Sequence, residues 1–402
     1  MRTVDEHLGE VLAHTHALES LDVSLLESRG CLLAEPVTAP WALPPFDAAG
    51  TDGYAVMAAD VATASAGAPI VMPVTDDVPA GYRASHPMVA GTAIRIGSGA
   101  PLPTGATAVV PFAFTDGGMP TVSVNQAVAA GHGVRRAGED VDPGQTVLPA
   151  GALVGAREVA LLAAVGRARV TVRPRPRVVV MSTGTELVEP GAAMTPGLIP
   201  DSNGYMLTAA AQDAGAMAYR AGPVRDEARA LMDTLEDQLV RADLIVTTGG
   251  VTAGTYDTMK TVLARLGSVE FTRVAMSPGM AQGHGYLGPD NVPIFTLPGN
   301  PSSAFVAFEI FVRPVIRRML GHQQVFRPLI PARLTHPVRG QPGVRTYLRG
   351  HLHGAADERL VSPIAEPGLL GLRLADSLIV LPEATGEVAA GAVVSVMPLG
   401  RS

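Results

Sequence analysis

The chain has 402 residues, which suggests two or three domains, and its 30 basic and 37 acidic residues give a net charge of −7. That balance argues against a protein that coats nucleic acid, and no apolar run reaches the roughly 18 residues of a membrane span. The single cysteine, Cys31, excludes a disulfide framework within the chain, and the polar first ten residues do not resemble a signal peptide, so we expect a cytoplasmic protein.

The first 174 residues predict a split domain with a small β module inserted in it. Thr3 and Glu6 form a capping-box pattern at the start of an amphipathic helix, and a second helix is predicted over Arg157–Val165, ending at Gly166. Between them, short β-type runs are broken by Gly and Pro; they are Pro69–Val74, Thr92–Ile96 and Ala108–Phe112.

The second half changes to alternating strands and helices, which predicts a doubly wound α/β domain with a parallel sheet. The predicted strands are Val178–Met181, Leu244–Thr248 and Ile294–Leu297, and the predicted helices are Asn203–Ala214, Asp226–Arg241, Asp257–Leu266 and Ser302–Leu320. Beyond Gly321 only short strands between Pro and Gly turns remain, which indicates a small β barrel or sandwich.

Three loops that follow these strands predict a binding site, because ligands of open α/β sheets bind at the carboxyl ends of the strands. The loops are Ser182–Glu186, Thr247–Thr252 and Leu297–Ser303. Each combines glycine, which lets the backbone approach a ligand closely, with hydroxyl side chains. One such loop would be ordinary, but three at one edge favour a site for phosphate or another oxyanion.

Carboxylates on the same edge suggest that the site also holds Mg²⁺. They are Glu186, Asp226 and Asp257, and the only lysine of the chain, Lys260, follows Asp257 by three residues. Asp226 could also be a helix-start residue favoured by the dipole, and we interpret Asp201 as a helix cap. Because the chain has neither a P-loop nor a dinucleotide glycine motif, we expect metal-assisted phosphoryl or anhydride chemistry.

Six segments, in order along the chain, resemble the motifs of the molybdopterin molybdenumtransferase (MoeA) family, which are shared with the gephyrin E domain. They are PPFDAAGTDGYAV (44–56), RIGSGAPLPTGATAVV (95–110), VRRAGEDV (134–141), VVVMSTGTEL (178–187), TTGGVTAGTYDTMK (247–260) and LPGNPSSAFVAFEIFVRP (297–314). The resemblance runs from about Val4 to the C-terminus.

The resemblance implies four domains and a homodimer. The expected parts are an elongated domain I (1–43 and 138–174), an inserted β domain II (44–137), an α/β molybdopterin-binding domain III (175–322) and a β-barrel domain IV (323–402). Family members form elongated homodimers, with the site between domain III of one subunit and domain II of the other. The molybdopterin adenylyltransferase is a further partner that the resemblance suggests.

The implied reaction inserts molybdenum from molybdate into adenylylated molybdopterin and releases AMP with the help of Mg²⁺. The site residues that the resemblance implies in the first half of the chain are Asp52, Ser98 and Asp140. Lys260 is implied to neutralise phosphate charge. Glu186, Asp226 and Asp257 hold Mg²⁺ and orient water. The remaining implied binding residues lie in the three loops; they are Thr183, Gly184, Thr248, Gly249, Gly250, Pro298, Asn300, Pro301 and Ser302.

Two departures from the family pattern concern molybdate. Lysines that the family commonly has are replaced here by Ser277 and Met280, and the Gly/Ser-rich C-terminal motif reads EPGLLGL at 366–372. As a hypothesis, Arg273, Arg345 and Arg349 supply the missing positive charge.

These departures leave an alternative open. The retained carboxylates and glycine loops favour an active molybdenum insertase, whereas the lost lysines favour a non-catalytic molybdopterin-binding or scaffold paralogue. A third reading, an adenylyltransferase, rests on domain III alone, and the additional domains argue against it.

Overall fold

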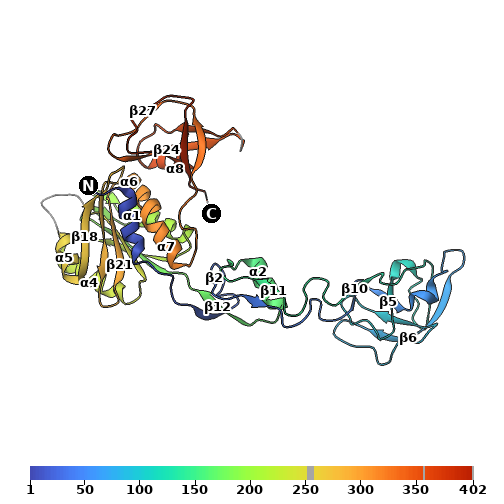
Figure 1. The fold of residues 1–402 in the computed structure, drawn as a ribbon. Helices are drawn as coiled ribbons and strands as arrows, with labels where there is room; N and C mark the ends of the chain where they lie inside the picture. The colour runs from blue at the N-terminus through green and yellow to red at the C-terminus, as the bar shows by residue number, and fades with distance from the viewer. Residues whose placement is uncertain (251–257, 356–357, 401–402) are drawn as a thin grey trace. The chain divides into compact units, whose positions relative to one another are not determined.

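The computed structural model describes residues 1–250, 258–355 and 358–400, which form two compact units (Figure 1). The first unit comprises residues 1–21, 30–32 and 172–402, and the second comprises residues 22–29 and 33–171. Among the described residues, no helix is both long enough and apolar enough to cross a membrane.

The second unit contains the predicted β module. Its five-stranded sheet has the order β8-β5-β7-β6-β9. Buried side chains such as Tyr54, Met72 and Val110 form one of its cores. Because successive residues of a strand point to opposite faces, Ala55 and Val109 belong to a second core. The elements around and within the module are β1 (Leu21–Ser24), β2 (Leu32–Leu33), β3 (Val37–Thr38), β4 (Ala48–Ala49), β5 (Gly53–Val56), η1 (Ala58–Val61), β6 (Ile70–Val78), β7 (Ala93–Ile96), β8 (Ala108–Pro111), η2 (Phe112–Phe114), β9 (Thr121–Val124), β10 (Val134–Arg135), β11 (Thr146–Leu148), α2 (Ala156–Ala164) and β12 (Arg169–Arg173).

The first unit contains a six-stranded sheet of order β16-β13-β17-β21-β20-β18. The first four strands are parallel, as predicted for this sheet, although β16 is a strand that the sequence did not predict. Strands β20 and β18 run antiparallel to their neighbours at one edge. The elements are β13 (Arg177–Thr183), β14 (Leu187–Val188), β15 (Ile199–Pro200), α3 (Asn203–Asp213), β16 (Met217–Val224), α4 (Ala228–Leu239), β17 (Leu244–Thr248), α5 (Thr258–Leu266), β18 (Gly267–Arg273), β19 (Met276–Ser277), β20 (Ala281–Leu287), β21 (Val292–Leu297), α6 (Pro301–Ala307), the π-helical η3 (Phe308–Val312) and α7 (Arg313–Met319).

Helices cover both faces of this sheet, which is why every residue of its central strand β17 is buried (Figure 1). Val178 and Val180 of β13 pack with α3, α6 and α7 in one core, while Val179 and Met181 pack with α4 and α5 in another. Helix α1 (Val4–Ala13), whose predicted capping box is present, joins the first of these cores. The four-domain division proposed from the sequence stays a prediction.

The C-terminal residues form a closed barrel. Strands β24, β25, β22, β28 and β26 pair in turn, and a β24–β26 pairing closes the ring. The elements are β22 (Ile330–Leu334), β23 (Val338–Arg339), β24 (Arg345–His353), β25 (Leu360–Pro363), α8 (Gly368–Leu374), β26 (Ser377–Leu381), β27 (Glu387–Val388) and β28 (Val393–Pro398). The sequence indicated either a β barrel or a β sandwich for this region. The closed ring of strands shows that it is a barrel.

Candidate functional site

The three predicted loops meet at the carboxyl edge of the parallel strands. Their parallel register places Thr183, Thr248 and Leu297 at neighbouring strand ends. Residues of all three loops line one cavity, together with the segment that leads into α3; its lining residues include Thr183, Glu186, Asp201, Asn203, Thr248, Gly249, Gly299 and Pro301. The structure therefore brings Thr183, Glu186, Thr248, Gly249 and Pro301 of the predicted site together.

Asn203 joins two of these loops. Its Nδ2 donates hydrogen bonds to Thr248 Oγ1 at 3.0 Å and to the Gly299 carbonyl oxygen at 2.7 Å. Thr248 Oγ1 in turn donates to the Pro298 carbonyl oxygen at 2.9 Å. Sequence reasoning missed Asn203 and Asp201, which it treated as helix-cap residues; the DSN sequence before a helix is an ordinary cap pattern, so no signal distinguished them.

Glycine is required at Gly249 by two independent features. Its φ is +98°, and a Cβ there would lie 2.5 Å from the Thr183 carbonyl oxygen. Gly250 also has a positive φ, of +69°. The backbone after β17 therefore turns with no side chain in the way and can approach a ligand closely, although the Gly249 amide itself donates to the Leu297 carbonyl oxygen at 3.1 Å.

Glu186 and Asp226 lie on adjacent loops. The Gly184 amide donates to the Val224 carbonyl oxygen at 3.0 Å, so the loop after β13 is joined to the end of β16, two residues before Asp226. The Glu186 carboxylate lies so close over Gly184 that a Cβ at that glycine would be 2.5 Å from Oε2. Asp226 Oδ1 is buried and has no hydrogen-bond partner among the described residues.

The remaining candidates of this edge are placed as follows. Asp257 lies outside the described residues. The Lys260 ammonium, on α5, lies 5.3 Å from the ring centroid of Phe271. Asn300 caps α6 by accepting a hydrogen bond from the Ser303 amide at 3.3 Å, with Pro301 as the first helical residue.

The three arginines expected to replace the family lysines have different surroundings. Arg273 Nε and Nη2 lie 3.3 and 3.0 Å from Met280 Sδ. Arg345 forms a two-pronged ion pair with Asp5, 2.8 Å at each oxygen, and a further pair with Glu383 at 2.9 Å. The hydrogen bond from Arg345 holds the pKa of the Asp5 carboxyl below its ordinary value.

Arg349 is the barrel arginine that approaches the third loop. Its Nη1 donates to the Gly368 carbonyl oxygen at 3.0 Å, and Ser302 Oγ donates to the same oxygen at 3.4 Å. A Cβ at Gly371 would lie 2.7 Å from Arg349 Nη1, so the guanidinium occupies space that a side chain at 371 would need. Arg345 is already neutralised by two carboxylates, and Arg349 is the better candidate for binding an anion.

The predicted residues of the second unit are exposed and grouped in part. Asp52 accepts a hydrogen bond from the Ser98 amide at 2.7 Å, so these two lie together. Asp140 forms an ion pair with Arg135 at 2.8 Å.

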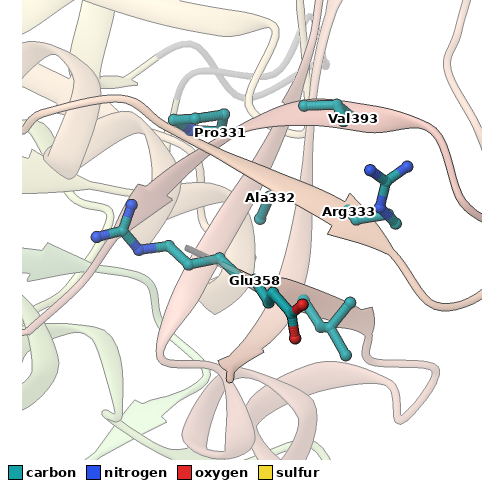
Figure 2. Close-up of a pocket in the computed structure, with 7 residues that line it drawn as sticks. Pro331, Ala332, Arg333, Glu358 and Val393 are labelled. Carbon is teal, nitrogen blue, oxygen red and sulfur yellow. The ribbon is translucent and has the colours of Figure 1, made fainter. Parts of the chain in front are cut away.

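Another pocket lies on the barrel and contains none of the predicted site residues (Figure 2). It is lined by Pro331, Ala332, Arg333, Glu358, Arg359, Leu360 and Val393. Arg333 donates to the Gly391 carbonyl oxygen at 2.6 Å. This barrel pocket shares no lining residue with the cavity at the sheet edge.

Comparisons with known proteins identify the family of the chain. Family models match three successive stretches: the MoeA N-terminal region (domain I and II) at residues 2–166, the domain described as "Probable molybdopterin binding domain" at 179–318, and the MoeA C-terminal region (domain IV) at 331–399. The cavity edge therefore lies within the part that matches the molybdopterin-binding model.

Similar curated proteins and solved structures cover the whole chain. Molybdopterin molybdenumtransferase 2 of Mycobacterium tuberculosis is 42% identical over 99% of this chain and 100% of its own length, and molybdopterin molybdenumtransferase 1 of the same species is 40% identical over the full length of both. A crystal structure of the molybdopterin biosynthesis MoeA protein from Pyrococcus horikosii matches with a TM-score of 0.78 and 30% identity, over 99% of each chain.

Proposed function

The chain belongs to the molybdopterin molybdenumtransferase family and acts as a transferase in molybdenum cofactor biosynthesis, and we propose that it inserts molybdenum from molybdate into adenylyl-molybdopterin at the described sheet edge. The observation that carries this proposal is the convergence of three glycine- and hydroxyl-containing loops on one cavity, joined by Asn203. Such an edge suits a ligand with phosphate groups.

The loop backbones hold the substrate in this proposal. Gly249 and Gly250 let the main chain approach the pyrophosphate, since neither position carries a side chain. Thr183, Gly184, Thr248, Pro298, Asn300, Pro301 and Ser302 shape the walls around it. Positioning of the two reactants is the main contribution of such a site to the rate.

Glu186 and Asp226 fit a Mg²⁺ ion, and Asp257 is the third ligand that we propose. Asp226 Oδ1 is a buried carboxylate oxygen with no hydrogen-bond partner among the described residues, and oxygen is the ligand atom that Mg²⁺ prefers. No group of three possible metal-ligating side chains occurs within residues 1–250, 258–355 and 358–400, and Asp257 lies outside these ranges. The bound ion would neutralise charge on the pyrophosphate, next to Lys260.

Arg349 and Ser302 are the residues that we propose for molybdate. They meet at the Gly368 carbonyl oxygen, and the guanidinium is a permanently charged fork that matches oxyanions. Arg273 supplies a cation beside Met280, one of the positions where a family lysine is missing, which supports the active insertase over a paralogue that binds without metal insertion.

The second unit completes the site in this proposal. Asp52, Ser98 and Asp140 would face the substrate from a second copy of the chain in a homodimer. A molybdopterin adenylyltransferase is the proposed supplier of substrate, and the cytoplasm is the proposed location.

Substitution of the carboxylates tests the assignment. We expect Glu186→Gln and Asp226→Asn to reduce molybdate-dependent AMP release at least about a hundredfold, since each removes a charged metal ligand. Asp243→Asn is a matched control, because Asp243 pairs with Arg177 at the opposite end of the sheet. Wild-type rates in both site variants would show that the site lies elsewhere.

A further inference from the structure

The chain leaves the main sheet between Glu186 and Asn203, in a segment that we call the excursion (187–202). Strands β14 and β15 pair in parallel within it through only two residue pairs, Leu187 with Ile199 and Val188 with Pro200. Because Glu186 precedes the excursion and Asn203 follows it, its position affects both residues at the cavity.

Arg220, on β16, binds both ends of the excursion. Its Nη2 lies 2.7 Å from each carboxylate oxygen of Glu189, just after β14, and its Nη1 lies 3.5 Å from Asp201 Oδ2, just after β15. The guanidinium carbon is 4.3 Å from the ring centroid of Tyr205, whose hydroxyl donates to Glu189 at 3.1 Å. One side chain therefore holds two points that are twelve residues apart in sequence.

The contact of Arg220 with Asp201 is buried. The Asp201 side chain is 1% exposed, and Arg220 is 19% exposed. A buried carboxylate without a cation is unfavourable, so loss of Arg220 would force this segment to rearrange. At the other end, the hydrogen bonds from Arg220 hold the pKa of the Glu189 carboxyl below its ordinary value.

Asp201 passes this constraint to the cavity. Its Oδ1 accepts a hydrogen bond from the Gly204 amide at 2.8 Å in the first turn of α3. A Cβ at Gly204 would lie 2.4 Å from Asp201 Oδ2, so these groups pack without spare room. Asn203 lies between them and donates to Thr248 and Gly299.

We propose that Arg220 is a positioning residue for the transferase reaction, which fixes the excursion so that Glu186 and Asn203 are correctly placed for the adenylyl-molybdopterin substrate. The inference rests on the function proposed above. Arg220 lines no part of the cavity described at the sheet edge and acts through Asp201 and Glu189.

Three variants of the full-length protein test this role: Arg220→Met, Arg220→Lys and the control Arg177→Met. Arg177, on β13, also forms a two-pronged pair, with Asp243, but at the other end of the sheet. The measurements are steady-state KM and kcat for adenylyl-molybdopterin, and hydrogen exchange of backbone amides in residues 187–206 without substrate.

We expect Arg220→Met to raise KM about tenfold or more, to lower kcat and to speed exchange in 187–206, as its two carboxylates lose their shared cation. Arg220→Lys should be intermediate, because an ammonium keeps the charge but not the fork. Arg177→Met should leave both KM and exchange in 187–206 unchanged.

Two results would overturn the inference: a folded Arg220→Met protein with wild-type KM and exchange, or equal effects of Arg177→Met. If the wild-type protein released no AMP with molybdate, the proposed function would fail. Exchange in 187–206 would still decide whether Arg220 holds the excursion.

Discussion

Arg349 and Ser302 donate hydrogen bonds to one acceptor, the Gly368 carbonyl oxygen, at 3.0 and 3.4 Å. Ser302 lies in the first turn of α6, the helix that follows β21, and Arg349 lies on β24 of the barrel. The shared acceptor fixes a guanidinium beside the LPGNPSS loop, where an oxyanion substrate would need positive charge.

Arg349→Met should raise the KM for molybdate about tenfold or more, because it removes a charge-assisted oxyanion contact. Arg349→Lys should be intermediate. Steady-state AMP release at varied molybdate measures this effect.

Arg345→Met is the matched control, because Asp5 and Glu383 already neutralise Arg345. It should lower thermal stability and leave the molybdate KM unchanged. Equal KM effects of the Arg345 and Arg349 variants would contradict the assignment of Arg349.

Met280→Lys should tighten molybdate binding, since it restores a family lysine beside Arg273. Arg273 Nη2 already lies 3.0 Å from Met280 Sδ, so two cations would meet there without an anion between them. We therefore expect a melting temperature that is lower without molybdate and recovers as molybdate is added. Melting curves at increasing molybdate test this, and an unchanged molybdate dependence would place the anion elsewhere.

Gly249→Ala should destabilise the protein by about 3 kcal/mol and abolish activity, because the new Cβ would have to displace the Thr183 carbonyl. Gly151→Ala is a control for backbone strain alone: its φ is +79°, but no atom lies within 4 Å of the added Cβ. That variant should cost about 1 kcal/mol and keep activity. Chemical denaturation and AMP release distinguish the two, and equal losses would mean that strain, not the clash, matters.

Acid should destabilise the first unit through His7 and His284. Burial is the main cause that lowers the pKa of each to about 4, and the rings pack edge to face, 6.4 Å apart. Because the unfolded chain binds these protons near pH 6.5, stability should fall as the pH drops from about 6.5 to 4, by up to about 3 kcal/mol per histidine.

His7→Phe should flatten that pH dependence, since it keeps a ring against Phe311, which packs 4.8 Å from His7. Denaturation at pH 7 and pH 5 measures the difference between variant and wild type. An identical pH slope in the two proteins would show that His7 titrates normally.

Much of the fold could be predicted from local pattern. The strand Leu244–Thr248 was predicted with its observed bounds, and the capping box at Thr3 and Glu6 is present. The three loops also meet as expected, because parallel strands bring their carboxyl ends to one edge. Apolar runs and glycines carry this information within a few residues of sequence.

Features that depend on distant residues were not predictable. Strands β18 and β20 contain glycines and polar residues, including Gly283 and Gly285, so their sequence gives no continuous apolar run. The roles of Asn203 and Arg220 depend on partners up to 96 residues away. Nothing in the sequence around them marks those contacts.

The most direct test of the account is single-turnover conversion of adenylyl-molybdopterin by the purified protein with Mg²⁺ and increasing molybdate. AMP and metallated cofactor are measured together. The account predicts that both appear in equal amounts and that their formation depends on molybdate. Tight binding of adenylyl-molybdopterin without AMP release at any molybdate concentration would contradict it and indicate a binding or scaffold protein.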